Sequence, residues 1–196
     1  WPDAEGDAAR NSFDNTLHRL RKLLGGERCL QLQAGGLGLD ARHCWTDVAA
    51  LQTCLGSLDA LQRQPADADP APTLALAQQA LALYRGPLLA GDDDLPLVLA
   101  ARARIEARFT RQMARTGEWL EAAGQAAEAA QLYARGLDVQ PLAEDLCRHL
   151  MACLIGLGQR AEAFAAYRRC RQQLSLLLNL RPDPATEALA DSIRDA

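Results

Sequence analysis

The sequence predicts a mainly α-helical chain that ends in repeated helix pairs. Residues 124–135 read GQAAEAAQLYAR, and 34 positions later residues 158–169 read GQRAEAFAAYRR, with the same residue at seven of the twelve positions. A helix–turn–helix unit that recurs every 34 residues is typical of a stacked helical repeat, which presents a binding surface. The composition agrees: the 49% of hydrophobic residues are mostly Ala and Leu, which favour helix, and aromatic residues make up only 5%.

The N-terminal segment predicts one amphipathic helix over residues 8–24. Its apolar side chains are spaced by four, three and four positions, which places them on one helix face: Phe13, Leu17, Leu20 and Leu24. Gly25 and Gly26 follow directly, and a glycine just past the last apolar residue is a usual helix end.

A β-hairpin is predicted after this helix. Residues 29–33 alternate as a strand does, residues 34–36 (Ala-Gly-Gly) predict a turn, and residues 37–39 predict a short return strand. A helix followed by a β-hairpin is, in general form, the end of a winged helix-turn-helix.

Residues 46–62 predict the next helix, with Thr46 as its N-cap. Its apolar stripe consists of Val48, Leu51, Leu55 and Leu58. Residues 63–73, RQPADADPAPT, contain three prolines, and this density excludes a regular element. The segment is therefore predicted to be a loop.

Two more helices are predicted between the loop at residues 63–73 and the motif that starts at residue 124. Thr73 is expected to cap a helix that runs to about Tyr84, where Gly-Pro follows. Residues 88–96 predict an irregular loop, whose three aspartates, Asp92–Asp94, are interpreted as solvated rather than as a cation site. A long helix is predicted over residues 97–123.

In the repeats, small residues are expected where two helices cross closely, and large residues fill the remaining space. The first unit has Gly117, Ala129 and Gly136 as small residues, with Tyr133 large and Pro141 at its end; the second has Ala163 and Cys170 as small residues, with Leu150, Leu154 and Tyr167 large. The last helix of the second unit continues through residues 172–180, and a final helix over residues 185–193 is expected to cap the stack. Together these features are the signature of a tetratricopeptide-like repeat domain.

The overall charge and composition restrict the classes of function and of binding site that we expect. A net charge of −4 means that any nucleic-acid contact must come from a local basic patch. The six cysteines form no C-x-x-C pair, so we expect reduced, packed thiols and neither a metal nor a cofactor. The sequence has no membrane-length apolar run, no signal peptide and no catalytic motif, so we expect a cytoplasmic protein that is not an enzyme. The chain opens at Trp1 rather than Met, and we expect it to be part of a longer protein.

The order of the motifs resembles a known family. A helix and hairpin, the W-x-D-V helix at 45–48, ALALYRGPLL at 80–89 and repeats that end in LRPDPAT at 180–186 are similar to the bacterial transcriptional activator domain family, which includes antibiotic-pathway activators. The resemblance covers essentially the whole chain. It implies residues 1–44 as a partial winged-helix DNA-binding domain, with recognition helix 8–24 and wing 28–40. It also implies residues 45–196 as a helical-repeat domain that mediates regulation and protein contacts.

The resemblance further implies that helix 8–24 lies in the major groove of duplex DNA. The candidate DNA-contacting residues are Arg10, Asn11, Asn15, Thr16, His18, Arg19, Arg21 and Lys22. Asn and Arg suit base edges, and Lys, Arg and Thr suit phosphates. The transcription machinery or other regulatory domains are the expected protein partners, and a homodimer is an open alternative.

A second function stays open, namely a repeat scaffold that binds no DNA and docks a peptide or another domain. The family wing usually carries Tyr and Arg after its glycines, whereas these places hold Leu37 and Gly38. This departure and the negative net charge favour the scaffold.

Overall fold

The computed structural model describes residues 6–33, 36–63, 69–91 and 95–194. The chain forms two compact units, Trp1–Ala50 and Leu51–Ala196. The first contains a helix and a hairpin, and the second is all-helical within the described ranges. This confirms the mainly α fold class with one small hairpin. Among the described helices, none is long and apolar enough to cross a membrane.

The first unit begins with α1, Gly6–Leu23, in which Leu17 is the buried residue. The two strands that follow, β1 (Leu30–Gln33) and β2 (Gly36–Leu39), pair antiparallel, with Leu30 opposite Leu39 and Gln33 opposite Gly36. Of the expected turn, residues 34 and 35 lie outside the described residues.

The start of the first strand was predicted wrongly. Cys29 belongs to a 3-10 turn, η1 (Glu27–Cys29), and not to the strand. The physical reason is the sharp exit from α1: Gly25 takes a left-handed φ of 79°, and the chain needs one more tight turn before it extends. The apolar–polar alternation does not reveal that turn.

A helix pair comes next, and the boundary between the two units falls within its first helix. In α2, Asp47–Leu61, the backbone N–H of Ala49 donates to Thr46 Oγ1 at 3.2 Å, which confirms the predicted N-cap. The expectation for α3 was wrong, because α3 spans Ala71–Leu83 and buries Thr73 within it. The side chain of Asp69 accepts the N–H of Ala71 at the true helix start. Proline is compatible with the first helical turn, so the loop ends earlier than its prolines indicate.

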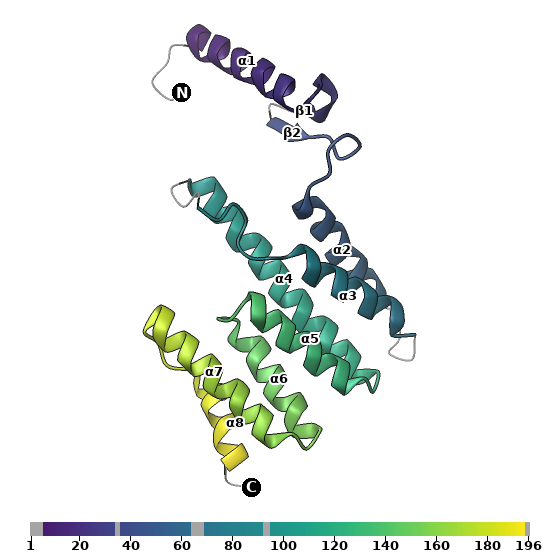
Figure 1. Cartoon of the computed structure of the whole chain (residues 1–196), viewed down its shortest axis with the longest axis vertical. Helices are drawn as coiled ribbons and strands as arrows, with labels where there is room; N and C mark the ends of the chain where they lie inside the picture. Colours follow the sequence, from purple (N-terminus) through teal and green to yellow (C-terminus); the bar gives the residue numbers. More distant parts are fainter. Residues whose placement is uncertain (1–5, 34–35, 64–68, 92–94, 195–196) are drawn as a thin grey trace. The chain divides into compact units, whose positions relative to one another are not determined.

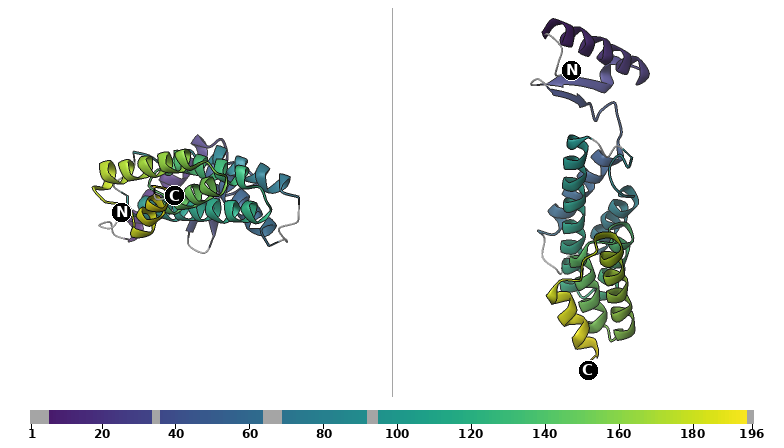
Figure 2. Two further views of the ribbon diagram at one scale, coloured as in Figure 1. Left: turned by 90° about the horizontal axis from the view of Figure 1, so that it is seen from below. Right: turned by 90° about the vertical axis from the view of Figure 1, so that its left-hand side faces the viewer.

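The helical repeats follow. They comprise α4 (Pro96–Ala122), α5 (Ala126–Val139), α6 (Glu144–Gly156), α7 (Arg160–Leu178) and a capping helix α8 (Pro184–Arg194). Each helix from α4 to α7 packs against the next, α6 also packs against α4, and α8 covers α6 and α7. Figure 1 shows this succession from teal to yellow, and in Figure 2 the same helices run side by side. Asp92–Asp94, the expected acidic loop, lies outside the described residues.

The two repeats have the same turn geometry. Gly124 and Gly158, 34 positions apart, both adopt φ of 76°, a left-handed conformation that favours glycine. The N–H of the following Gln donates to a leucine carbonyl at 2.8 Å in both repeats, Gln125 to Leu120 and Gln159 to Leu154. The sequence identity therefore reflects a repeated backbone structure.

The close helix crossings lie at the small residues that the sequence singled out. A Cβ at Gly117 would overlap the ring of Tyr133, and a Cβ at Gly136 would lie 2.9 Å from Leu146 Cδ1. Tyr133, Ala129 and Ala163 are fully buried. The Tyr133 hydroxyl donates to Glu121 Oε1 at 2.6 Å, so the polar end of this core side chain is satisfied.

Candidate nucleic-acid interface and repeat groove

The candidate DNA-contacting residues all lie on α1. Five of them share the side of the helix opposite Leu17, since residues four and three positions apart lie close together on a helix. All five are exposed, and they are called the α1 polar face below: Asn11, Asn15, His18, Arg19 and Lys22. This surface offers amide, imidazole, guanidinium and ammonium groups to a partner.

The other three candidates lie elsewhere on α1. Arg10 and Arg21 are within about 40° of Leu17 around the helix, at 100° per residue. The Arg21 Nε is shielded from solvent and has no hydrogen-bond partner among the described residues. Thr16 is exposed, but its hydroxyl donates to the Ser12 carbonyl at 2.8 Å. The eight candidates therefore divide into one coherent face of five, Thr16 beside that face, and Arg10 and Arg21 on the side of Leu17.

A basic hollow of about 360 Å³ lies at the C-terminal end of α1. It is lined by His18, Arg21, Lys22, Gly25 and Gly26. Basic side chains at this end of a helix also stabilise it, because they face the partial negative charge of the last carbonyl groups. The presence of these basic side chains is therefore explained in part by their contribution to the stability of α1.

Sequence reasoning missed a polar network at the base of the hairpin. The carboxylate of Asp40, 6% exposed, accepts hydrogen bonds from the Arg42 backbone N–H at 3.0 Å and from its guanidinium at 2.8 and 3.1 Å. The side chain of Gln31 on β1 also donates to it. Because hydrogen bonds from the Arg42 side chain and backbone favour the ionised form, the pKa of Asp40 falls from 3.8 to about 2. The network ties the end of β2 to β1.

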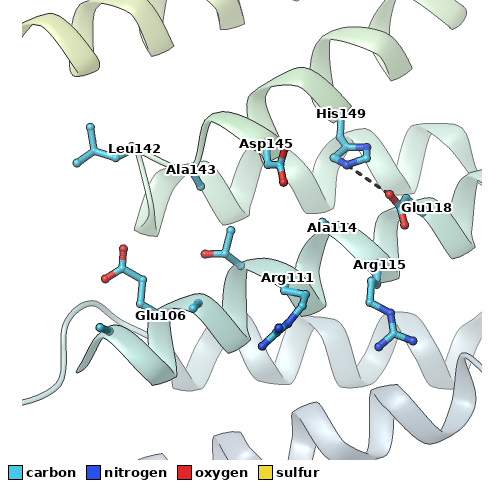
Figure 3. A pocket seen from close by; sticks show the side chains of 12 residues that line it. Glu106, Arg111, Ala114, Arg115, Glu118, Leu142, Ala143, Asp145 and His149 are labelled. Carbon is cyan, nitrogen blue, oxygen red and sulfur yellow. Dashed lines mark ion pairs between the residues drawn. The ribbon is translucent and has the colours of Figure 1, made fainter. Parts of the chain in front are cut away.

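The second candidate site is a groove between α4 and α6 with a volume of about 660 Å³, called the repeat groove below. Figure 3 shows it from close by, with Glu106, Arg111 and Arg115 coming from α4 and Leu142, Asp145 and His149 from the α6 side. Small side chains make its floor: Ala103, Ala107, Ala114 and Ala143. An ion pair between His149 Nε2 and Glu118 Oε1, at 3.4 Å, closes one end.

Sequence reasoning did not identify the repeat groove. The groove forms only because α4 and α6 lie side by side. Its lining residues are up to 46 positions apart in the sequence, from Ala103 to His149. One available signal was the spacing of four arginines along α4 by four, three and four positions, the same spacing that marks apolar helix faces: Arg104, Arg108, Arg111 and Arg115. Two of them, Arg111 and Arg115, line the groove.

The cysteines are all free thiols, as expected from their spacing. Cys54, Cys147, Cys153 and Cys170 are buried in the helical unit, and Cys29 and Cys44 are half-buried in the first unit. Burial raises the pKa of Cys54 and of Cys153, as expected of thiols that pack as small apolar groups.

Comparison with solved structures identifies a similar fold. A structure described as Mycobacterium tuberculosis EmbR in complex with low affinity phosphopeptide matches with a TM-score of 0.65 and 22% sequence identity. The match covers 100% of this chain and 52% of the EmbR chain, so this chain spans about half the length of that protein. No curated protein matches the sequence significantly.

The family model described as bacterial transcriptional activator domain matches residues 47–194. This range begins at the first residue of α2 and ends at the last residue of α8, so it includes the whole repeat stack and the helix pair before it. The chain therefore belongs to the bacterial transcriptional activator domain family.

Proposed function

We propose that this transcriptional-activator-type regulator reads duplex DNA through the α1 polar face and receives its regulatory partner on the helical repeats. Family membership supports the regulatory role. In this proposal residues 1–44 form the DNA-reading part, residues 45–196 form the repeat domain, and the protein works in the cytoplasm by binding rather than by catalysis.

The observation that carries the DNA proposal is the composition of the α1 polar face. Its five exposed side chains combine two asparagines, which suit base edges, with a histidine and two permanent cations, which suit phosphates. An α-helix of about 10–12 Å diameter fits the major groove, which is about 12 Å wide. The face is long enough to meet several base pairs, because Asn11 and Lys22 lie about 16 Å apart along the helix axis at about 1.5 Å per residue.

The local charge favours an anionic partner even though the whole chain is acidic. From Arg10 to Arg28 the sequence holds five basic residues and two acidic ones, an excess of three positive charges. About three phosphate contacts would give a slope of roughly −2 to −3 when log K is plotted against log salt concentration.

A second role, docking of a partner by the repeats, is favoured by a separate observation. The repeat groove has a volume of about 660 Å³, within the range usual for ligand sites, and its floor of alanines leaves room for a partner's backbone. Docking there and DNA reading at α1 use different surfaces, so the protein can have either role without the other.

The DNA proposal is tested by fluorescence anisotropy with labelled promoter duplexes and the full-length gene product. Arg19→Ala/Lys22→Ala removes two charges from the α1 polar face and should weaken binding about tenfold at low salt. The matched control, Arg135→Ala/Arg168→Ala, removes two exposed arginines from α5 and α7 and should leave binding unchanged. Equal affinity of the Arg19→Ala/Lys22→Ala variant and the wild type would refute the assignment.

A further inference from the structure

Four arginines form a continuous row along α4, called the arginine row below: Arg104, Arg108, Arg111 and Arg115. Their spacing of four, three and four residues places them within about 60° of one another around the helix and spreads them over about 16 Å. Arg104, Arg111 and Arg115 are exposed and Arg108 is half-buried. A row of one sign stands out on a chain whose net charge is −4.

The helix itself does not neutralise this row. Arg104, Arg108 and Arg111 have no Asp or Glu three or four positions away on either side. Their charged neighbours three or four positions away are all arginines of the row, and like charges four positions apart destabilise a helix. Folding stability alone therefore does not explain the arrangement.

The neighbouring helix α2 contacts only two of the four arginines in the row. Arg115 pairs with Asp59 of α2 at 2.7 Å, and the Arg108 guanidinium lies near Gly56 of the same helix. Arg104 and Arg111 have no ion pair or hydrogen bond with any described residue. Two exposed guanidinium groups, about 10.5 Å apart along α4, are thus available to a partner.

The repeat groove lies directly beside these two arginines. Arg111 lines it, and three alanines of its floor (Ala103, Ala107 and Ala114) lie on the same helix as the row. At one end of the groove, Glu118 of α4 pairs with His149, and on the α6 side Asp145 pairs with Arg148. Glu106 is the remaining carboxylate of the lining and has no ion pair among the described residues. Of the two available guanidinium groups, that of Arg111 belongs to the lining, whereas Arg104 continues the row along α4 outside it.

We propose that the arginine row, at the edge of the repeat groove, binds an extended acidic segment of a partner protein, whose carboxylates pair with Arg104 and Arg111. In the extended polyproline II conformation a chain has three residues per turn and advances about 3.1 Å per residue, so carboxylates three residues apart lie on one side about 9.3 Å from each other, close to the separation of these arginines. Arginine pairs with carboxylates through two parallel hydrogen bonds, which adds orientation to the charge attraction. Duplex DNA fits less well, because the groove runs between helices that pack against each other. This inference rests on the proposed docking role of the repeats and not on DNA binding by α1.

The test measures binding of a fluorescein-labelled peptide to the whole chain. The peptide has nine residues, all glycine except for three glutamates, each three positions from the next. Binding measured by fluorescence anisotropy at low salt should weaken about tenfold or more in Arg104→Glu/Arg111→Glu. A milder variant, Arg104→Gln/Arg111→Gln, should weaken it in the same direction. The matched control, Arg135→Glu/Arg168→Glu, makes the same charge change on exposed residues of α5 and α7 and should bind as the wild type does.

Three outcomes would overturn the inference. The two charge-reversal variants could lose binding equally, which would show unspecific attraction, or the Arg104→Glu/Arg111→Glu variant could bind as well as the wild type. A probe with glutamine in place of glutamate could bind equally well, which would show that the carboxylates are not recognised. Loss of duplex binding with Arg104→Glu/Arg111→Glu, alongside unchanged peptide binding, would assign the row to DNA. Failure of the α1 proposal is seen separately, in duplex binding by the Arg19→Ala/Lys22→Ala variant.

Discussion

The close crossing of α4 and α5 at Gly117 gives the sharpest prediction about the repeat fold. A Cβ added at Gly117 would overlap the ring of Tyr133, including its hydroxyl oxygen. That ring is fully buried, and its hydroxyl is held by Glu121 at 2.6 Å, so it has little room to move. Gly117→Ala should therefore destabilise the protein, although alanine is the better helix former.

The magnitude follows from three contributions. Overpacking a core by one methyl group costs about 1–3 kcal/mol. Displacing the Tyr133 hydroxyl from the Glu121 carboxylate costs about 1.5–3 kcal/mol. The helix propensity of alanine returns about 1 kcal/mol. The expected loss is about 2–5 kcal/mol, and since each kcal/mol changes the Tm of a chain of this size by about 2–4 °C, the Tm should fall by roughly 4–20 °C.

Gly156 provides the matched control. It is the last residue of α6, it is exposed, and a Cβ there would meet no atom within 4 Å. Gly156→Ala should raise stability by up to about 1 kcal/mol through helix propensity alone. The assay is thermal unfolding of the whole chain followed by far-ultraviolet circular dichroism.

A rescue variant separates packing from propensity. Tyr133→Leu alone removes the ring and its hydrogen bond, and Gly117→Ala should cost much less in that background than in the wild type. A coupling energy near zero in this double-mutant cycle, or a Gly117→Ala variant as stable as Gly156→Ala, would refute the close approach of α4 and α5.

Three further predictions concern a cap and two titrations. Thr46→Ala removes the acceptor for the first turn of α2 and should cost about 0.5–2 kcal/mol in denaturant unfolding, whereas Thr46→Ser should cost little. The pKa of Asp40 is lowered to about 2, so the stability that its ionised form contributes is complete above pH 4 and is lost as the pH falls towards 2; a carboxyl carbon NMR titration should find this midpoint, and one near 3.8 would contradict the Arg42 network. Burial raises the pKa of all three tyrosines, so tyrosinate absorbance should stay low at pH 10 in the folded chain and appear on unfolding, and stability should fall as the pH rises above 10.

The sequence predicted the elements of this fold well where one local signal dominated. Gly124 and Gly158 mark turns because a left-handed backbone favours glycine, and Thr46 caps a helix through its own side chain. Gly117 and Tyr133 were placed at a helix crossing from the repeat pattern alone, and the structure confirms them there. The turns and the cap are determined by one local segment each, and the crossing follows from the repeat pattern.

Predictions were wrong or missing where two local sequence signals compete, or where the structure depends on residues that are far apart in the sequence. Thr73 is a good N-cap residue, but Asp69 and a proline in the first turn start α3 earlier. The Asp40 network depends on hairpin register, which brings Gln31 on β1 within reach of a residue nine positions later. The repeat groove depends on the packing of α6 against α4, and no local pattern encodes that packing.

The candidate DNA site was predicted in part. Helix spacing from Leu17 already separates the α1 polar face from Arg10 and Arg21, because a residue's direction around a helix follows from its position. The solvent shielding of the Arg21 Nε could not be predicted in the same way, since it depends on packing in the folded chain and not on helix position alone. Contact of the α1 polar face with DNA stays a prediction.

The salt dependence of duplex binding tests the central claim most directly. For the full-length gene product, a plot of log K against log salt concentration should have a slope of roughly −2 to −3, and Arg19→Ala/Lys22→Ala should make that slope shallower by about 2. That result would place both cations against phosphates and identify α1 as the DNA reader. A slope that is the same in wild type and variant would contradict the account and leave the helical repeats as the functional surface of the chain.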